Sequence, residues 1–386
     1  MIKILTQIIS KNIFLMIKKK IYPYYKGLFL YLFFKNSNIQ IHIPKYNVVD
    51  EKDLDLANRI FSSFKKMKSQ QSEVDSIYKP SSLWQKLIDQ DFKYLNECLK
   101  ENNLKNFLFF LQNFGNWDNY LGIENQLIIK KYSKNIFLKK YLKENVFNGQ
   151  KLIWEYFNND KDISSLNMPR FGNQNGALID KNFVVIGSFF NHIYSKIIIN
   201  YLDNNRNNSI VDLGAGYGKL AYYILSKVKN CNFIDFDIPE TLVLASYYLA
   251  KSFPNKKTFF YGEKQFDQDL TKKFDLVFLP NWEFKNIKND SIDITINRNS
   301  LGEMDSNAAI NFINHIHRSS KYFFSMNHET FKNKFSDGKY SLINKEFNMD
   351  NKFRELIRYP DLGHITYETN KINLESDIFF YLYEKK

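Results

Sequence analysis

The pattern of apolar and polar positions changes close to residue 200. Before it, apolar side chains recur three and four residues apart, as on one helix face, over residues 53–66, 82–99, 106–114 and 136–147. After it, apolar runs of strand length alternate with helical segments. The first pattern predicts a mainly α-helical region. The second is typical of a parallel sheet whose strands are joined by crossover helices.

The C-terminal pattern can be followed element by element. It predicts strands at residues 209–213, 232–236, 274–279, 292–297 and 321–326, and helices at residues 219–228, 239–251 and 307–317. Residues 363–368 and 377–383 are expected to pair as a closing antiparallel hairpin. Residues 258–261 form a further short strand whose place in the sheet stays open. The predicted fold class is therefore α/β, with a mostly parallel sheet after a helical N-terminal region.

The first 45 residues form a third region, a basic and aromatic arm. Apolar runs at residues 13–17 and 28–34 are interspersed with lysines, and a strand-like segment at residues 39–43 ends the arm. Neither run reaches the ~20 apolar residues that span a membrane. No small-residue cleavage site follows, as it would in a secretory signal. We expect a helix packed on the rest of the protein; the alternative is a helix lying on the inner, anionic surface of a membrane.

These patterns divide the chain into three parts. The arm covers residues 1–45, a mainly helical domain covers residues 46–200, and an α/β domain covers residues 201–386. With 386 residues the chain is long enough to bury two cores. The helical domain is expected to supply an acceptor pocket or a homodimer contact.

Charge and cysteine content narrow the class of protein only slightly. The chain has 54 Lys+Arg against 41 Asp+Glu, a net charge of +13 that would suit nucleic acid. Only seven of these residues are Arg, the side chain best suited to bidentate phosphate contacts, so a Lys-rich solvated surface is favoured. Cys98 and Cys231 form no Cys-x-x-Cys pair, which argues against a disulfide framework and for a reducing cytoplasm.

A glycine-rich turn is expected between the first strand of the α/β region and its helix. The sequence there is Val211-Asp212-Leu213-Gly214-Ala215-Gly216-Tyr217-Gly218. Glycines let the backbone turn sharply and approach a ligand, at which the N–H groups of the helix then point. A dinucleotide-binding G-x-G-x-x-G would need glycine where Lys219 stands. The spacing here is G-x-G-x-G, with Asp212 two residues before the first glycine.

An acidic residue ends the next predicted strand, in Phe236-Asp237-Ile238-Pro239. A carboxylate at this position can accept hydrogen bonds from both hydroxyls of a ribose. Asp235 is the alternative acid, because it lies on the same face of the strand, two residues deeper.

Together these residues resemble the class I S-adenosylmethionine-dependent methyltransferases. The resemblance covers residues 201–386 and implies a Rossmann-like domain, with a mostly parallel seven-stranded sheet and a C-terminal antiparallel hairpin. It implies S-adenosylmethionine as the cofactor. Gly214, Gly216 and Gly218 would then surround its methionine part, Asp212 its ammonium group, and Asp237 with Ile238 its ribose.

Residues after two later strands extend the implied cofactor site. Asn281-Trp282 follows the strand at 274–279, where the resemblance implies a loop that covers the adenine. Trp282 would wall the ring and Asn281 would hold its amino group; the alternative is a tryptophan packed under a surface loop. Asn297, at the end of the strand at 292–297, belongs to the same predicted site.

Three further segments are similar to bacterial sugar O-methyltransferases found with surface-glycan genes: Pro169–Asn173 with Gly176, His192–Tyr194, and Asn299–Met304. This similarity implies methyl transfer to a sugar hydroxyl, on a nucleotide-linked, lipid-linked or growing glycan. Arg170, Asn173 and His192 become candidate acceptor-binding residues, with a domain-interface role as the alternative for Arg170 and His192. Asn175 departs from the tyrosine expected there, which puts one pocket contact in question.

Methyl transfer to a hydroxyl needs an aligned acceptor and a group that removes the hydroxyl proton. Glu303 is the first candidate base, if burial raises its pKa, and Asn299 would orient the acceptor. His328, after the strand at 321–326, is the rival base because histidine titrates near neutral pH. Plainer roles remain open for both: capping the next helix for Glu303, and a backbone hydrogen bond for His328. We expect no bound metal.

Two other functions compete with this one. An RNA or other nucleic-acid methyltransferase would fit the positive charge. However, Asn297-Arg298-Asn299-Ser300 stands where amino-methylating enzymes of that class carry Asn/Asp-Pro-Pro-Tyr. A non-catalytic scaffold with a methyltransferase fold is the second alternative, and the intact glycine turn with Asp212 and Asp237 argues against it. We therefore expect no nucleic-acid partner.

Overall fold

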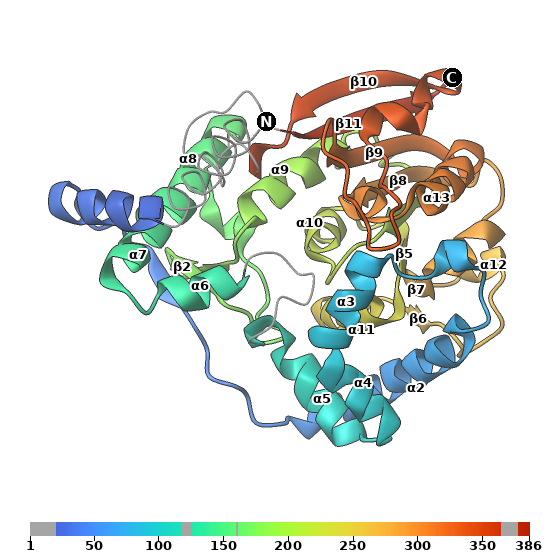
Figure 1. The fold of residues 1–386 in the computed structure, drawn as a ribbon, viewed down its shortest axis with the longest axis horizontal. Coiled ribbons are helices and arrows are strands. Elements are labelled where there is room, and N and C mark those ends of the chain that lie inside the picture. Colours follow the sequence, from blue (N-terminus) through green and yellow to red (C-terminus); the bar gives the residue numbers. More distant parts are fainter. Residues whose placement is uncertain (1–20, 118–125, 160, 364–376) are drawn as a thin grey trace, which may run out of the picture.

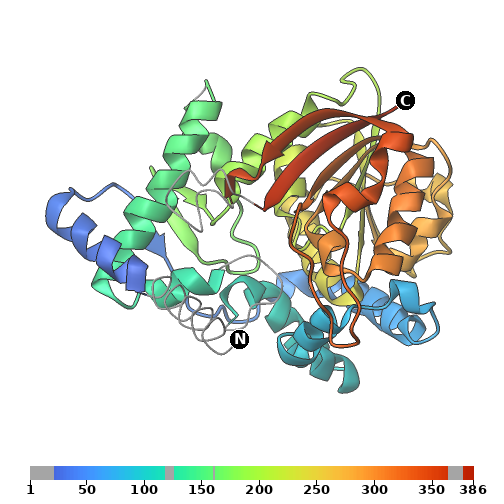
Figure 2. The same ribbon diagram turned by 45° about the horizontal axis from the view of Figure 1, so that its top comes forward.

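The computed structural model describes residues 21–117, 126–159, 161–363 and 377–386, and these form two lobes (Figures 1 and 2). The larger lobe contains an eight-stranded sheet, and the smaller contains a three-stranded sheet with helices around it. No helix within the described ranges is long and apolar enough to cross a membrane. The two lobes meet along a continuous cluster of buried apolar side chains, so the chain packs as one connected body.

The large sheet has the strand order β10-β11-β9-β8-β4-β5-β7-β6. Its strands are β4 Asn208–Leu213, β5 Cys231–Asp237, β6 Thr258–Phe260, β7 Leu276–Pro280, β8 Ile292–Arg298, β9 Ser320–His328, β10 Phe353–Pro360 and β11 Ile378–Lys385. The six strands from β4 to β9 pair in parallel, and β10 and β11 are antiparallel. This is the Rossmann-like arrangement of class I methyltransferases, so the predicted fold class is confirmed.

Two details of the sheet differ from the prediction. The sheet has eight strands where seven were expected, because β6 (the unplaced strand) adds an outer edge beside β7. The closing hairpin pairs β11 with residues 353–360, where residues 363–368 had been expected. Of that expected strand, Gly363 lies in a helical turn and residues 364–368 lie outside the described residues. β10 was missed because it is an edge strand whose charged side chains remain exposed, which hides the apolar pattern.

Crossover helices cover both faces of the sheet (Figure 2). On one face lie α9 Ser188–Ile199, α10 Lys219–Lys227 and α11 Pro239–Ser252, and on the other lie α12 Gln268–Thr271 and α13 Ser306–Ser319. Because both faces are covered, β4 and β8 are almost wholly buried. The predicted helices at 219–228, 239–251 and 307–317 are confirmed.

The N-terminal region is mainly helical, as predicted. A helix over residues 21–33 is followed by α2 Leu54–Gln71, α3 Ser82–Gln90, α4 Lys93–Lys100, α5 Leu104–Asn113, α6 Gln126–Tyr132, α7 Ile136–Tyr141 and α8 Asn148–Phe157. It also holds a small sheet of β1 Gln40–His42, β2 Gly176–Ile179 and β3 Asn182–Val184. The β2–β3 hairpin was not predicted. Its turn places Asp180 and Lys181 at positive φ, a conformation for which Asn-Gly or Asp-Gly would have been the usual signal.

Helices α2 to α5 lie against the large sheet's lobe (Figure 1). Asp53, just before α2, is buried and accepts hydrogen bonds from Tyr247 and Lys251 of α11. Lys68 of α2 pairs at 2.6 Å with Glu240 of α11, whose side chain is fully buried. The division at residues 45 and 200 stays a prediction, but these contacts join part of the predicted helical domain to the α/β domain. They hold the segment after α2 above the sheet.

Candidate active site

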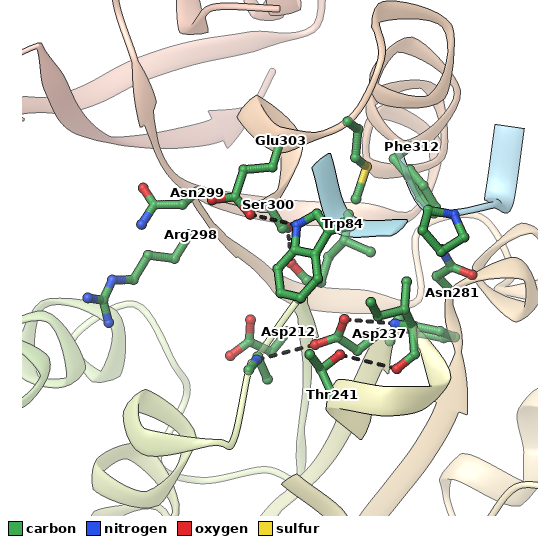
Figure 3. A pocket seen from close by; sticks show the side chains of 18 of the residues that line it. Trp84, Asp212, Asp237, Thr241, Asn281, Arg298, Asn299, Ser300, Glu303 and Phe312 are labelled. Atoms are coloured by element: carbon green, nitrogen blue, oxygen red, sulfur yellow. Dashed lines mark hydrogen bonds between the residues drawn. The ribbon is translucent and has the colours of Figure 1, made fainter. Parts of the chain in front are cut away.

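A cavity opens at the carboxyl ends of β4, β5, β7 and β8 (Figure 3). This is the edge of a parallel sheet where ligands bind in α/β folds. The cavity is lined from the sheet side by Asp212, Gly214, Gly216, Asp237, Ile238, Asn281, Arg298, Asn299, Ser300 and Glu303, among others. Residues of the N-terminal region close it from above, namely Ile77, Lys79, Pro80, Ser81 and Trp84.

The glycine-rich turn after β4 forms the floor of the cavity. Gly214 and Gly216 have φ of 86° and 63°, in the left-handed region that side chains disfavour. A Cβ atom on Gly214 would lie 2.5 Å from Ser300 Oγ, whereas one on Gly216 would meet nothing within 4 Å. Gly216 therefore faces open space and Gly214 sits against the β8 loop. Gly218 does not line the cavity, because it packs against Leu249 of α11.

Asp237 lies beside this turn, at the end of β5. Its carboxylate accepts hydrogen bonds from the backbone N–H of Ile238 at 2.7 Å and of Gly216 at 3.3 Å. Burial raises the pKa of Asp237 to about 6, although these hydrogen bonds and one from Thr241 act in the opposite direction. The predicted neighbours Asp212 and Asp237 are thus brought together by the pairing of β4 with β5.

The cavity floor is rich in carboxyl groups. Burial, and then the charge of Asp237, raises the pKa of Asp212 to about 8, while Arg298 partly offsets the effect. Asp235, the alternative acid, is fully buried beneath the floor and does not line the cavity; burial raises its pKa well above the usual range. Such a concentration of carboxyl groups favours a cationic ligand, because a cation stabilises their ionised forms.

Of the two residues predicted to contact an adenine, Asn281 lines the cavity and Trp282 does not. Asn281 lines the cavity and donates from Nδ2 to the carbonyl oxygen of Tyr78 at 3.0 Å. Its buried Oδ1 atom accepts no hydrogen bond. Trp282 does not line the cavity; it is buried with its ring edge-on to Tyr261. The apolar wall is made by Ile77, Pro80, Ile238, Ala308 and Phe312.

Asn297 supports the cavity from behind. It is fully buried, and its Nδ2 donates to the carbonyl oxygen of Leu213 at 2.8 Å and to Ser300 Oγ. Ser300 Oγ in turn donates to the same carbonyl at 2.8 Å. Asn297 therefore ties the β8 loop to the end of β4 and does not itself line the cavity.

Glu303 reaches the cavity from the short helix Ser300–Glu303 and meets α3 there. Trp84 Nε1 donates to Glu303 Oε2 at 2.8 Å, and Ser81 Oγ donates to the Glu303 carbonyl oxygen at 2.7 Å (Figure 3). Burial raises the pKa of Glu303, and the hydrogen bond from Trp84 lowers it. A carboxylate with a raised pKa is a stronger base than a solvated one. Asn299 also lines the cavity, at an unusual φ of 67°.

His328 lies outside the cavity. Its Nδ1 atom is hydrogen-bonded to Asp377, which also accepts bonds from the backbone N–H groups of Thr330 and Phe331. The ring of His328 lies next to that of Phe331. His328 is not among the residues that line the cavity, so Glu303 is the better placed of the two candidate bases.

The three candidate acceptor-binding residues also lie away from the cavity. Arg170 stacks its guanidinium over the ring of Phe183, 5.1 Å from its centroid. Asn173 donates to Asn113 Oδ1 at 2.9 Å and to the Lys45 carbonyl oxygen. The Nδ1 atom of His192 accepts from Trp154 Nε1 at 3.0 Å. Asn175 is buried and donates to the carbonyl oxygen of Gly115. In this geometry Arg170, Asn173 and Asn175 join segments of the smaller lobe, whereas His192 joins α8 of that lobe to α9, which covers the large sheet.

The residues that cover the cavity were not predicted from the sequence. Ser81 caps the N-terminus of α3 and Trp84 lies in its first turn. The Pro-Ser-Ser run before an apolar helix predicts the cap, and Trp84 was recognised only as an apolar helix position. Nothing local indicates that α3 crosses the end of the sheet. Among the described residues, no group of three His, Cys, Asp or Glu side chains is arranged to hold a metal ion.

No protein-family model and no curated protein matches the chain. Solved structures of similar fold include the mitomycin 7-O-methyltransferase MmcR, at 12% identity and TM-score 0.31, over 51% of this chain and 57% of that one. An S-adenosylmethionine-dependent methyltransferase from Aquifex aeolicus has 11% identity and TM-score 0.32, over 49% and 87%. The 1,6-didemethyltoxoflavin-N1-methyltransferase of Burkholderia thailandensis has 14% identity and TM-score 0.35, over 51% and 78%. The similarity concerns the fold alone.

Proposed function

We propose that the protein is an S-adenosylmethionine-dependent methyltransferase. The observation that carries the proposal is the acidic cavity, in which the glycine turn lies beside Asp212 and Asp237 at the carboxyl ends of adjacent strands. S-adenosylmethionine carries two positive groups, an ammonium and a sulfonium. It suits a floor where the pKa of Asp212 is raised to about 8 and that of Asp237 to about 6.

The ammonium group, the ribose and the adenine of this cofactor each have a fitting partner among the lining residues. Asp212 would hold the ammonium group and Asp237 the ribose hydroxyls. Asn281 has a buried Oδ1 acceptor without a hydrogen bond, which suits the amino group of adenine. Ile238 and Phe312 offer apolar contact to the ring. When bound, the cofactor supplies a methyl carbon that the sulfonium has already activated.

The residues that would remove the acceptor proton and orient the acceptor line the upper side of the cavity. Glu303 is held by Trp84 and has a raised pKa, so it can accept a proton from an acceptor hydroxyl. Asn299 presents a buried Oδ1 atom that accepts no hydrogen bond and would orient the acceptor. Residues 77–84 cover this side of the cavity and would shield both side chains from water.

We propose a sugar hydroxyl as the acceptor, in bacterial surface-glycan biosynthesis. Support comes from the similarity of Asn299–Met304 to sugar O-methyltransferases and from the polar side chains at this end of the cavity, Asn299, Ser300, Glu303 and Asp305. Carboxylates and amides suit sugar hydroxyls. The carboxylates disfavour an RNA backbone close to the site.

Calorimetry tests whether the protein binds the proposed cofactor. S-adenosylmethionine should bind to the wild type, and Asp237→Ala should bind at least 100-fold more weakly, because two hydrogen bonds to a carboxylate contribute roughly 1.5–3 kcal/mol each. Asp55→Ala, at an exposed aspartate of α2, is the control and should bind as the wild type does. Absence of binding to the wild type would leave only the scaffold alternative.

A second experiment tests the acceptor. Cofactor with a labelled methyl group is incubated with sugar nucleotides, purified bacterial glycan and RNA in separate reactions. We expect label in a carbohydrate, at an oxygen. Label in RNA alone would refute the sugar proposal and leave the methyltransferase proposal intact.

A further inference from the structure

The helix at residues 21–33 exposes an unusual number of large apolar side chains. Figure 1 shows this helix, in dark blue, projecting from the end of the molecule that is remote from the large sheet. Leu32 is 62% exposed and Phe33 is 70% exposed. Other exposed members are Ile21, Tyr24, Tyr25, Leu28, Phe29, Tyr31 and Phe34. We call these nine residues the aromatic face.

Contacts on the opposite side fix the orientation of this helix. Its buried positions are Pro23, Gly27 and Leu30. A Cβ atom on Gly27 would lie 2.1 Å from the carbonyl oxygen of Phe137 in α7, so the two helices touch through their backbones. The expected packed helix is therefore present, but only one narrow side of it is packed.

A buried lysine also fixes the C-terminal end of the helix. Lys140 Nζ of α7 donates to the carbonyl oxygens of Phe34 and Lys35 at 3.0 Å each and to Asn36 Oδ1 at 2.9 Å. A cation at a helix C-terminus satisfies carbonyl groups that have no partner within the helix. The aromatic face is thus held outward by specific contacts.

The exposed charges around the aromatic face are mainly positive, because the side chain of the nearby acid Glu144 is buried and paired with Lys140. The first acidic residue of the chain is Asp50. Lys26 and Lys35 lie on or beside the helix, and Lys131, Lys134 and Lys139 are exposed on the α6–α7 segment that supports it. A second copy of this surface would bring lysines against lysines, which disfavours self-association through it. An anionic surface complements it.

The length of the helix decides how it would meet a membrane. Thirteen helical residues extend about 20 Å, shorter than the ~30 Å hydrocarbon core of a bilayer. Aromatic and aliphatic side chains flanked by lysines are typical of helices that lie in the interface between headgroups and acyl chains. We propose that the aromatic face docks the protein on the surface of a membrane that contains anionic lipids.

Vesicle sedimentation of the full chain tests the proposal. The wild type should sediment with vesicles of phosphatidylcholine mixed with phosphatidylglycerol, and much less with phosphatidylcholine alone. The triple variant Leu28→Ser, Leu32→Ser, Phe33→Ser should bind the mixed vesicles at least tenfold more weakly, because three apolar side chains no longer enter the interface. Lys26→Gln with Lys35→Gln should weaken binding severalfold.

A matched control separates this face from other exposed apolar residues. Leu152→Ser, Tyr156→Ser, Phe157→Ser removes three exposed apolar side chains from α8 and should bind vesicles as the wild type does. If both triple variants have the melting temperature of the wild type, the substitutions do not affect folding. Failure of the wild type to bind anionic vesicles refutes the proposal.

Two further outcomes would also refute it. If the protein bound vesicles only after residues 1–20 were removed, those residues would be the partner that covers the aromatic face. A concentration-dependent dimer that the Leu28, Leu32 and Phe33 substitutions abolish, without vesicle binding, would show a second copy as the occupant. None of these readouts depends on methyl transfer, so the docking and the enzymatic proposals stand or fall separately.

Discussion

The floor and the cover of the cavity are built in different ways. The floor comes from two consecutive strand ends, β4 and β5, and its key residues lie within Asp212–Ile238. The cover comes from residues 77–84, far away in the sequence, and it reaches the floor through Trp84 and Glu303. We propose a functional division between these two parts. The floor holds the cofactor, and the cover positions the groups that act on the acceptor. Four predictions test that division.

The largest effect is expected at the meeting point of the two parts. Glu303→Gln keeps the shape of the side chain but removes the base, so turnover should fall by roughly 10²- to 10⁴-fold. Cofactor affinity, measured by calorimetry, should stay within about twofold of the wild type. Glu283→Gln, beyond the cavity lining, is the control. Full activity of Glu303→Gln would move the role of base to another residue, with His328 the next to test.

Gly214→Ala should damage the floor itself. The new Cβ would lie 2.5 Å from Ser300 Oγ at a φ of 86°, so both the turn and the β8 loop must shift. We expect cofactor affinity to fall by about tenfold to 100-fold and the melting temperature to fall, since the backbone strain alone is roughly 1–2 kcal/mol.

Gly216→Ala is the matched comparison for that prediction. It carries the same kind of backbone strain at a φ of 63° without a clash, because its Cβ would meet nothing within 4 Å. Its loss of melting temperature should be the smaller of the two. An equal loss in both variants would mean that the contact with Ser300 has no influence.

The pH dependence of cofactor binding should report the charge of the floor. The pKa of Asp212 is about 8 in the free protein, and a bound cation favours the carboxylate and therefore lowers that pKa. Binding at pH 7 should release up to about one proton, and affinity should rise by at most about tenfold per pH unit up to pH 8. Calorimetry in buffers of different ionisation enthalpy measures the released protons. Proton uptake would contradict the assignment.

The smallest effect is expected from Trp84→Phe in the cover. The substitution keeps an aromatic ring but removes the donor to Glu303 Oε2. Because that hydrogen bond favours the ionised form, its loss should raise the pKa of Glu303 and shift the acid limb of the kcat/KM profile to higher pH. Turnover at neutral pH should fall by about tenfold. Trp117→Phe, outside the cavity lining, should leave the profile unchanged.

Some elements were predictable because their signals are local. The β4 turn needs glycine where φ is positive, and Asp237 stands at a strand end, so both can be recognised within a few residues. The strands β4, β5, β8 and β9 were predicted because each carries several β-branched or aromatic residues over a short span, as is typical of strands. The edge strand β10 has a weaker signal, since the exposed charged residues Arg354, Glu355 and Arg358 interrupt its apolar residues.

Side chains with ambiguous roles were the hardest to predict. Trp282, expected at the cavity, is a buried packing residue, whereas Trp84, recognised only for its apolar character, lines the cavity. Both are tryptophans that bury a large ring and donate one hydrogen bond. Which of the two faces the cavity depends on how α3 crosses the end of the sheet, and no pattern within α3 contains that information.

The sequence by itself determined the fold class, the positions of most strands along the chain, and a glycine turn followed by an acidic strand end. These follow from hydrophobic periodicity and backbone sterics, which act over a few residues. Only the tertiary structure decided that residues 77–84 cover the cavity and that Trp84 holds Glu303 there. It also decided that His328 is not among the residues that line the cavity. Those arrangements depend on the packing of α2 against α11 and on ion pairs between these two helices and the residue before α2. These contacts join segments that are far apart in the sequence, so no local pattern predicts them.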